Sequence, residues 1–300
     1  MTAAPPTPAK TSRGFARRSP ALIVTALLLA VGVGIAGAGA IGAYLSQNPS
    51  LLLMVTPVYV IYTVLVVLIL FWLVPWQRPT WWALTMAFLW GFLVVASLQL
   101  MVNGGIGQLL LATGGVSFYN AWAPAFSGSF TEEALKAAGV LLALAISTRA
   151  PRTPSFVFLI GATVGLGFQV FENLNVTLQY AQGAGSTNWE ATSFILLNRA
   201  VLLGALSHVM YTGIFGLGLG YFLTADRGLP NRLLALIAGA LFAVSSHFVN
   251  NSPYLKEAFP DSPVASLLKG AVFFAGFVVA MIWMVRNDNR YYKKPFFSSE

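Results

Sequence analysis

Three charged residues lie near the start of an apolar segment of this 300-residue chain. The stretch FTEEALKAAG places Glu132, Glu133 and Lys136 directly before VLLALAIST, a run typical of a membrane helix. An ionisable side chain at the centre of such a helix costs about 2.5–3.5 kcal/mol, so it usually faces a protein interior or a water-filled cavity. The four-residue spacing of Glu132 and Lys136 favours an ion pair. Glu133 points about 100° further round the helix and is therefore expected to be free for partners on other helices.

Three other apolar segments also carry residues suited to acid–base chemistry. Glu172 lies in the stretch FENLN, and the two histidines of the chain, His208 and His247, lie in the next two segments. Asn251 follows His247 by one helical turn, so both would lie on one face of their helix. These residues are candidates for one shared site.

Hydrolysis of a peptide bond would use such residues. The reaction needs a base that activates water, a group that stabilises the oxyanion and an acid for the leaving amine. Glu133, or Glu132, is the candidate base. His247 and Asn251 are the candidate oxyanion donors, and His208 is the candidate that positions the water or protonates the amine.

A metal site is the rival interpretation of the same residues. Two neutral imidazoles and a carboxylate form a known catalytic zinc set, and here they would be Glu172, His208 and His247. The sequence HExxH is absent, and with no Cys a thiolate site is excluded. A zinc mechanism and a metal-free mechanism both stay open at this point.

The composition predicts an all-α, polytopic integral membrane protein. The chain is 57% hydrophobic and 9% charged, and long apolar runs recur along it. The stretch Asn103–Phe126 is less regular and suggests an external loop or an interfacial segment, with a re-entrant segment as a further alternative. The first run follows a basic tail, as a cleaved signal peptide would, but it is too long for a signal core. About eight transmembrane helices are expected, namely Ala21–Leu45, Leu51–Pro75, Trp81–Val102, Gly128–Thr148, Pro154–Ala181, Phe194–Leu223, Leu233–Asn250 and Pro263–Val285.

The basic residues predict the orientation of these helices. An even number of spans puts both termini on one side, and the loops on that side hold all but four of the 17 Lys and Arg residues. Such a bias marks the cytoplasmic side, so we expect a multi-pass cell-membrane protein with both termini cytoplasmic. Because the net charge of +8 follows from this bias, nucleic-acid binding is not expected.

The candidate site residues also share a predicted depth. Glu132, Glu133, Glu172, His208 and His247 lie roughly 14–18 residues from the cytoplasmic end of their helices, or ~20–27 Å at 1.5 Å per residue. The hydrocarbon core is about 30 Å thick, so all five would lie in its outer half. If these five residues had separate structural roles, nothing would require them to lie at one depth in the membrane.

The order of these motifs resembles the PrsW family of intramembrane proteases, which is grouped with CAAX prenyl proteases and bacteriocin-processing enzymes. The matching motifs are Glu132-Glu133-Ala134-Leu135-Lys136, Phe171-Glu172-Asn173, His208 with Thr212, Gly213 and Gly216, and His247 with Asn251. One departure is Val176, where the family usually has Tyr four residues after the Glu of the second motif. The match covers about Phe130–Asn251.

The resemblance implies a four-helix catalytic core and an endopeptidase that cuts a single-span membrane protein, such as an anti-sigma factor, near its extracytoplasmic boundary. Two other classes fit the buried charges: a proton- or cation-coupled transporter, although no inverted repeat is seen, and a non-catalytic membrane partner built on a protease-like core. The expected organisation is a cytoplasmic tail (1–20), three transmembrane helices and an external loop (21–126), the core (127–251), and a last helix with a basic tail (252–300).

Overall fold

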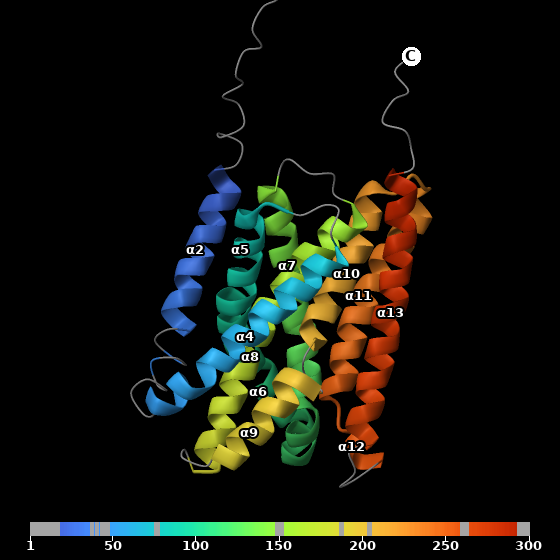
Figure 1. The fold of residues 1–300 in the computed structure, drawn as a ribbon. Coiled ribbons are helices and arrows are strands. Elements are labelled where there is room, and N and C mark those ends of the chain that lie inside the picture. The colour runs from blue at the N-terminus through green and yellow to red at the C-terminus, as the bar shows by residue number, and fades with distance from the viewer. Residues whose placement is uncertain are drawn as a thin grey trace, which may run out of the picture.

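The computed structural model of the chain is a bundle of long helices (Figure 1). It describes residues 19–36, 39, 42, 49–74, 79–147, 153–185, 189–202, 206–258 and 264–292, and these contain no strand. The all-α prediction agrees with this architecture. The elements, with η for π-helical segments, are α2 (Ser19–Ala36), α4 (Pro49–Leu73), α5 (Trp81–Leu89), η2 (Trp90–Val95), α6 (Ala96–Ala123), η3 (Pro124–Gly128), α7 (Ser129–Ile146), α8 (Pro154–Gly183), α9 (Trp189–Leu197), η4 (Asn198–Leu202), α10 (Ser207–Thr224), α11 (Leu229–Asn251), α12 (Tyr254–Ala258) and α13 (Val264–Tyr292).

Four helical segments of the described chain are long and apolar enough to cross a membrane: Pro49–Leu73, Trp81–Ile146, Pro154–Gly183 and Leu229–Asn251. Two shorter apolar helical stretches cover Leu22–Ile35 and Gly270–Met284. Many large apolar side chains on α4 and α13 are exposed, as lipid-facing helices require. The structure therefore supports a membrane protein, while the count of eight spans stays a prediction.

The two ends of the described chain lie at the same end of the bundle. Figure 1 shows the first turn of α2 and the last turn of α13 at the same level, on opposite sides of the bundle in this view, as an even number of passes predicts. The cytoplasmic location of this end stays a prediction. Much of the basic sequence on which it rests lies outside the described residues, namely the tail up to residue 18, Arg78, Arg149, Arg152, Lys293 and Lys294.

The stretch Asn103–Phe126 is helical on both sides of one turn, whereas its glycines suggested a loop or an interfacial segment. It belongs to α6 and η3, and Gly115 alone departs from helical geometry, with φ 77° and ψ 177°. A Cβ built on Gly107 would lie 3.1 Å from the Tyr119 ring, although residues twelve apart are about 18 Å apart along a straight helix. The chain therefore folds back at Gly115, where only glycine adopts the required backbone conformation easily.

The predicted single span Phe194–Leu223 is also divided. Its residues fall in α9, η4 and α10, and Leu206 (φ −134°, ψ 13°) precedes α10 with a backbone that is not helical. His208 therefore lies in the first turn of α10 rather than in the middle of a continuous helix. This break leaves backbone N–H groups at the start of α10 that need partners from elsewhere.

Helix α8 is the centre of the bundle. Its residues from Pro154 to Phe171 are all buried, with α10 on one side and α5 and η2 on another. Glycines allow these close approaches, because a Cβ on Gly165 would overlap the carbonyl of His208 and one on Gly167 would overlap that of Phe88. The packing of α8 against α10 therefore determines where His208 lies.

Candidate active site

Helix α7 contributes two carboxylates and a buried ammonium group. Lys136 has no exposed side-chain area, and its Nζ donates to Glu133 Oε1 at 2.8 Å and to Glu132 Oε2 at 3.4 Å. Glu133 was expected to be free for partners on other helices, but it also pairs with Lys136 of its own helix. The lysine stem reaches the residue three positions earlier as well as the one four positions earlier, and the shorter contact is to Glu133.

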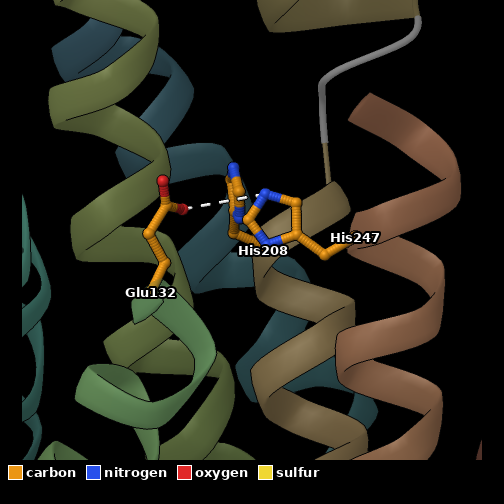
Figure 2. A group of neighbouring side chains, drawn as sticks. All are labelled: Glu132, His208 and His247. Carbon is orange, nitrogen blue, oxygen red and sulfur yellow. Dashed lines mark ion pairs between the residues drawn. The ribbon is translucent and has the colours of Figure 1, made fainter. Parts of the chain in front are cut away.

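The rings of His208 (α10) and His247 (α11) lie in contact with each other, next to the charged side chains of α7. Their ring centroids are 4.8 Å apart with planes at 80°, and both side chains are buried. His247 Nδ1 lies 2.9 Å from Glu133 Oε1. The other nitrogen of His247, Nε2, lies 3.7 Å from Glu132 Oε2 (Figure 2). The carboxylates of α7 therefore face both imidazoles, as the shared depth predicted.

The contacts of His208 indicate where its ring proton lies. Its Nδ1 is 3.0 Å from Lys136 Nζ, and because an ammonium group can only donate, Nδ1 must accept. Its Nε2 is 2.9 Å from Glu172 Oε2, which can accept a proton from it. His247 Nδ1 faces a carboxylate oxygen, Glu133 Oε1, and can therefore donate its proton to it.

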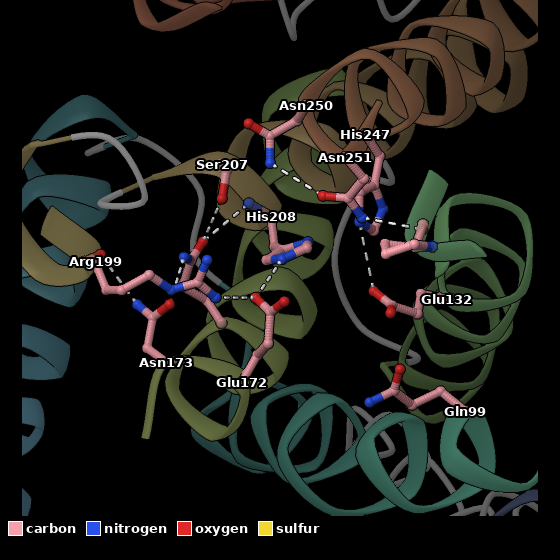
Figure 3. A network of polar contacts seen from close by, with 12 residues as sticks. Gln99, Glu132, Glu172, Asn173, Arg199, Ser207, His208, His247, Asn250 and Asn251 are labelled. Atoms are coloured by element: carbon pink, nitrogen blue, oxygen red, sulfur yellow. Dashed lines mark hydrogen bonds and ion pairs between the residues drawn. The ribbon is translucent and has the colours of Figure 1, made fainter. Parts of the chain in front are cut away.

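Glu172 lies at the more exposed side of the cluster. Its side chain is 28% exposed, compared with 8% or less for Glu132, Glu133 and both histidines. Its Oε2 also pairs with Arg199 Nη2 of η4 at 2.7 Å (Figure 3). The structure therefore brings together all five residues that were predicted to share one level.

Asn251 points to a different partner. Its Nδ2 donates to the carbonyl of Pro124 at 3.3 Å, and its Oδ1 accepts from Asn250 Nδ2 at 3.3 Å. A joint oxyanion contact with His247 would require the bond to Pro124 to open. In this structure Asn251 links α11 to η3.

The group best placed to hold a metal differs from the predicted one. One ligand atom each of Glu132, His208 and His247 lies within 4.8 Å of the others, and all three residues are buried. Glu132 therefore stands where Glu172 was predicted, because Glu172 turns toward Arg199. Histidines that bind metals usually donate their other ring N–H to a carboxylate, as His247 does to Glu133 and His208 does to Glu172. The residues fit a metal ion.

Several residues around the cluster were missed as site residues. Gln169 Oε1 accepts from the backbone N of His208 at 2.9 Å. The Tyr211 ring stacks on that of His247 with centroids 5.5 Å apart, and its buried hydroxyl has no hydrogen-bond partner among the described residues. Gln169, Glu172 and Asn173 follow the i, i+3, i+4 spacing of one helix face, which could have identified Gln169.

Comparison with known families identifies the chain. A search of curated proteins and of solved structures gave no match. A family model described as PrsW family intramembrane metalloprotease matches residues 79–285, which is more than half of the chain. The match is longer than the predicted Phe130–Asn251 and contains every predicted site residue. The chain belongs to the PrsW family of intramembrane proteases.

Proposed function

We propose that this protein hydrolyses a peptide bond of a membrane-spanning substrate at the cluster of α7, α10 and α11. The observation that carries the proposal is the convergence of Glu132, Glu133, His208 and His247 on a layer buried inside a membrane protein. Buried carboxylates and imidazoles that face one another can exchange protons with a bound water and with a leaving amine. Membership of the PrsW family supports the same activity.

The contacts suggest a division of roles among these residues. Glu133 accepts from Lys136 and His247, which hold its carboxylate in one orientation for taking a proton from the attacking water. The proton that Glu133 takes from the water can then pass to the leaving amine, while His208, whose Nε2 proton is held by Glu172, helps to position the water. Glu133 is therefore our choice as the base.

Glu132, His208 and His247 would hold the metal, for which zinc is the proposed ion. When bound, zinc makes a coordinated water more acidic and polarises the scissile carbonyl. His247 Nε2 lies 3.7 Å from Glu132 Oε2, so the two atoms could bind the same ion. His208 Nδ1 is engaged by Lys136, so Lys136 must release it before His208 can bind a metal.

The metal content of the purified protein distinguishes a zinc mechanism from a metal-free mechanism. We expect about one equivalent of zinc per purified chain by inductively coupled plasma mass spectrometry, because three ligands usually form such a catalytic site. His247→Ala should lose this metal, while Glu190→Gln, which changes an exposed carboxylate on α9, should keep it. A fully active wild-type preparation without metal would instead assign the chemistry to the side chains alone.

The proposed substrate is a single-span membrane protein, such as an anti-sigma factor, cut near its extracytoplasmic boundary. This follows from the predicted orientation, with both termini cytoplasmic and the cluster in the outer half of the membrane. A regular substrate helix resists hydrolysis because its peptide groups are hydrogen-bonded and shielded. The site should therefore act where the substrate helix ends.

The position of the cut tests this arrangement. Single-span reporters with Gly at the external boundary should be cut roughly 5-fold faster than reporters with Ala, because Gly lowers helix stability by about 1 kcal/mol. Mass spectrometry of the products locates the bond. A cut in the cytoplasmic half of the span would contradict both the orientation and the proposed site.

A further inference from the structure

Arg199 is connected to His208 through side chains of α8, although the two residues belong to different helical segments. Its Nη2 lies 2.7 Å from Glu172 Oε2, and the same oxygen lies 2.9 Å from His208 Nε2. A single carboxylate oxygen therefore forms an ion pair with the guanidinium and a hydrogen bond with the imidazole (Figure 3). This is a direct path from Arg199 to the ring of His208.

A second path connects the backbones of the same two residues. Asn173 Nδ2 donates to the carbonyl of Arg199 at 3.2 Å, and Asn173 Oδ1 accepts from Gln169 Nε2 at 3.4 Å. Gln169 Oε1 in turn accepts from the backbone N of His208 at 2.9 Å and from Ser207 Oγ at 3.2 Å. The two paths form a closed ring of one ion pair and several hydrogen bonds that joins α8 to η4 and α10.

This ring compensates for the break before α10. A helix start leaves N–H groups without intrahelical partners, and the side chain of Gln169 supplies one for His208. His208 is therefore held by α8 and η4 rather than by a preceding turn of its own helix. The ring also places a cation beside Glu172, the most exposed carboxylate of the cluster.

We propose that Arg199 is a positioning residue for the reaction. By pairing with Glu172, it holds that carboxylate in the direction of His208 Nε2, so that the ring proton stays on Nε2 and the lone pair of Nδ1 accepts from Lys136 of α7. The structural part of this proposal stands on the contacts alone. Its effect on catalysis rests on the proposed proteolysis.

The first test reads the ring of His208 without any substrate. The chain has two histidines, so ¹⁵N-histidine labelling of the full-length protein in detergent gives signals from His208 and His247 only, which His247→Ala assigns. We expect Arg199→Gln to change the signals of His208 from those of a single Nε2–H tautomer to a mixture. Arg199→Lys, which keeps a cation, should preserve the wild-type signals.

The second test measures cleavage of a fluorogenic single-span reporter by the same variants. Removing a partner of this kind typically costs 10–100-fold, so we expect Arg199→Gln to lower kcat by about 10–100-fold with KM nearly unchanged. Arg199→Lys should restore kcat to within about tenfold of wild type. Arg232→Gln is the matched control. Arg232 Nε donates to the carbonyl of Phe222, a residue of α10, at 2.6 Å, and this contact lies away from the cluster.

The outcomes distinguish the positioning role of Arg199 from the proposed proteolysis. Wild-type His208 signals in Arg199→Gln, or an Arg199→Lys variant as impaired as Arg199→Gln, would overturn the positioning role. Unchanged kcat in Arg199→Gln would overturn its effect on catalysis. If the wild type cuts no reporter, the proposed function fails, while the ¹⁵N signals still decide whether Arg199 holds His208.

Discussion

Glu133→Gln is expected to lower cleavage by at least about 100-fold, and His208→Ala and His247→Ala are expected to do the same. General acid–base groups typically contribute 10²–10⁴-fold, and Gln keeps the size of Glu and can still accept from Lys136 while losing the basic carboxylate. The measurement is the initial rate of cleavage of a single-span reporter by purified protein. Each variant should still insert into the membrane and purify as a monodisperse species.

The control for Glu133→Gln is Glu190→Gln, which makes the same chemical change at an exposed position of α9 and should cleave at the wild-type rate. Retained cleavage by Glu133→Gln alone would move the role of base to Glu132 or Glu172. Retained cleavage by all three site variants would rule out proteolysis at this cluster.

Gly165→Ala is expected to lower both the thermal stability of the protein and its activity. The added Cβ would overlap the carbonyl of His208, and a backbone atom cannot move aside as a flexible side chain can. Overpacking of this kind typically costs 1–3 kcal/mol, and here it displaces a residue of the site. We expect a lower Tm by tryptophan fluorescence and a cleavage rate reduced by at least about tenfold, since small displacements of reacting groups reduce rates strongly.

Gly104→Ala is the matched control, because a Cβ at Gly104 of α6 has no atom within 4 Å. That change should leave cleavage unaltered and keep or raise Tm, since Ala favours a helix more than Gly does. A Gly165→Ala protein with the wild-type Tm and rate would show that α8 and α10 are not packed as closely as the structure has them.

The sequence did not indicate the break before α10, because that segment is largely apolar and contains no Pro at the point of change. Near Gly115 the sequence did indicate an irregular stretch, but not that helices form on both sides of a single turn. The turn depends on contact between Gly107 and Tyr119, and the start of α10 depends on Gln169 of another helix. At the start of α10, a contact with a distant part of the chain therefore overrides local helix propensity.

The sequence by itself determined the helical membrane class and the residues of the cluster. Apolar runs can satisfy their backbone in lipid only as helices, and charges within them must face the protein interior, so composition and depth were enough to single out Glu132, Glu133, Glu172, His208 and His247. Only the tertiary structure decided their pairing. Glu132 rather than Glu172 joins the two imidazoles, Glu133 binds Lys136 and His247, and Glu172 binds Arg199, because these contacts depend on how each helix is rotated and packed against its neighbours.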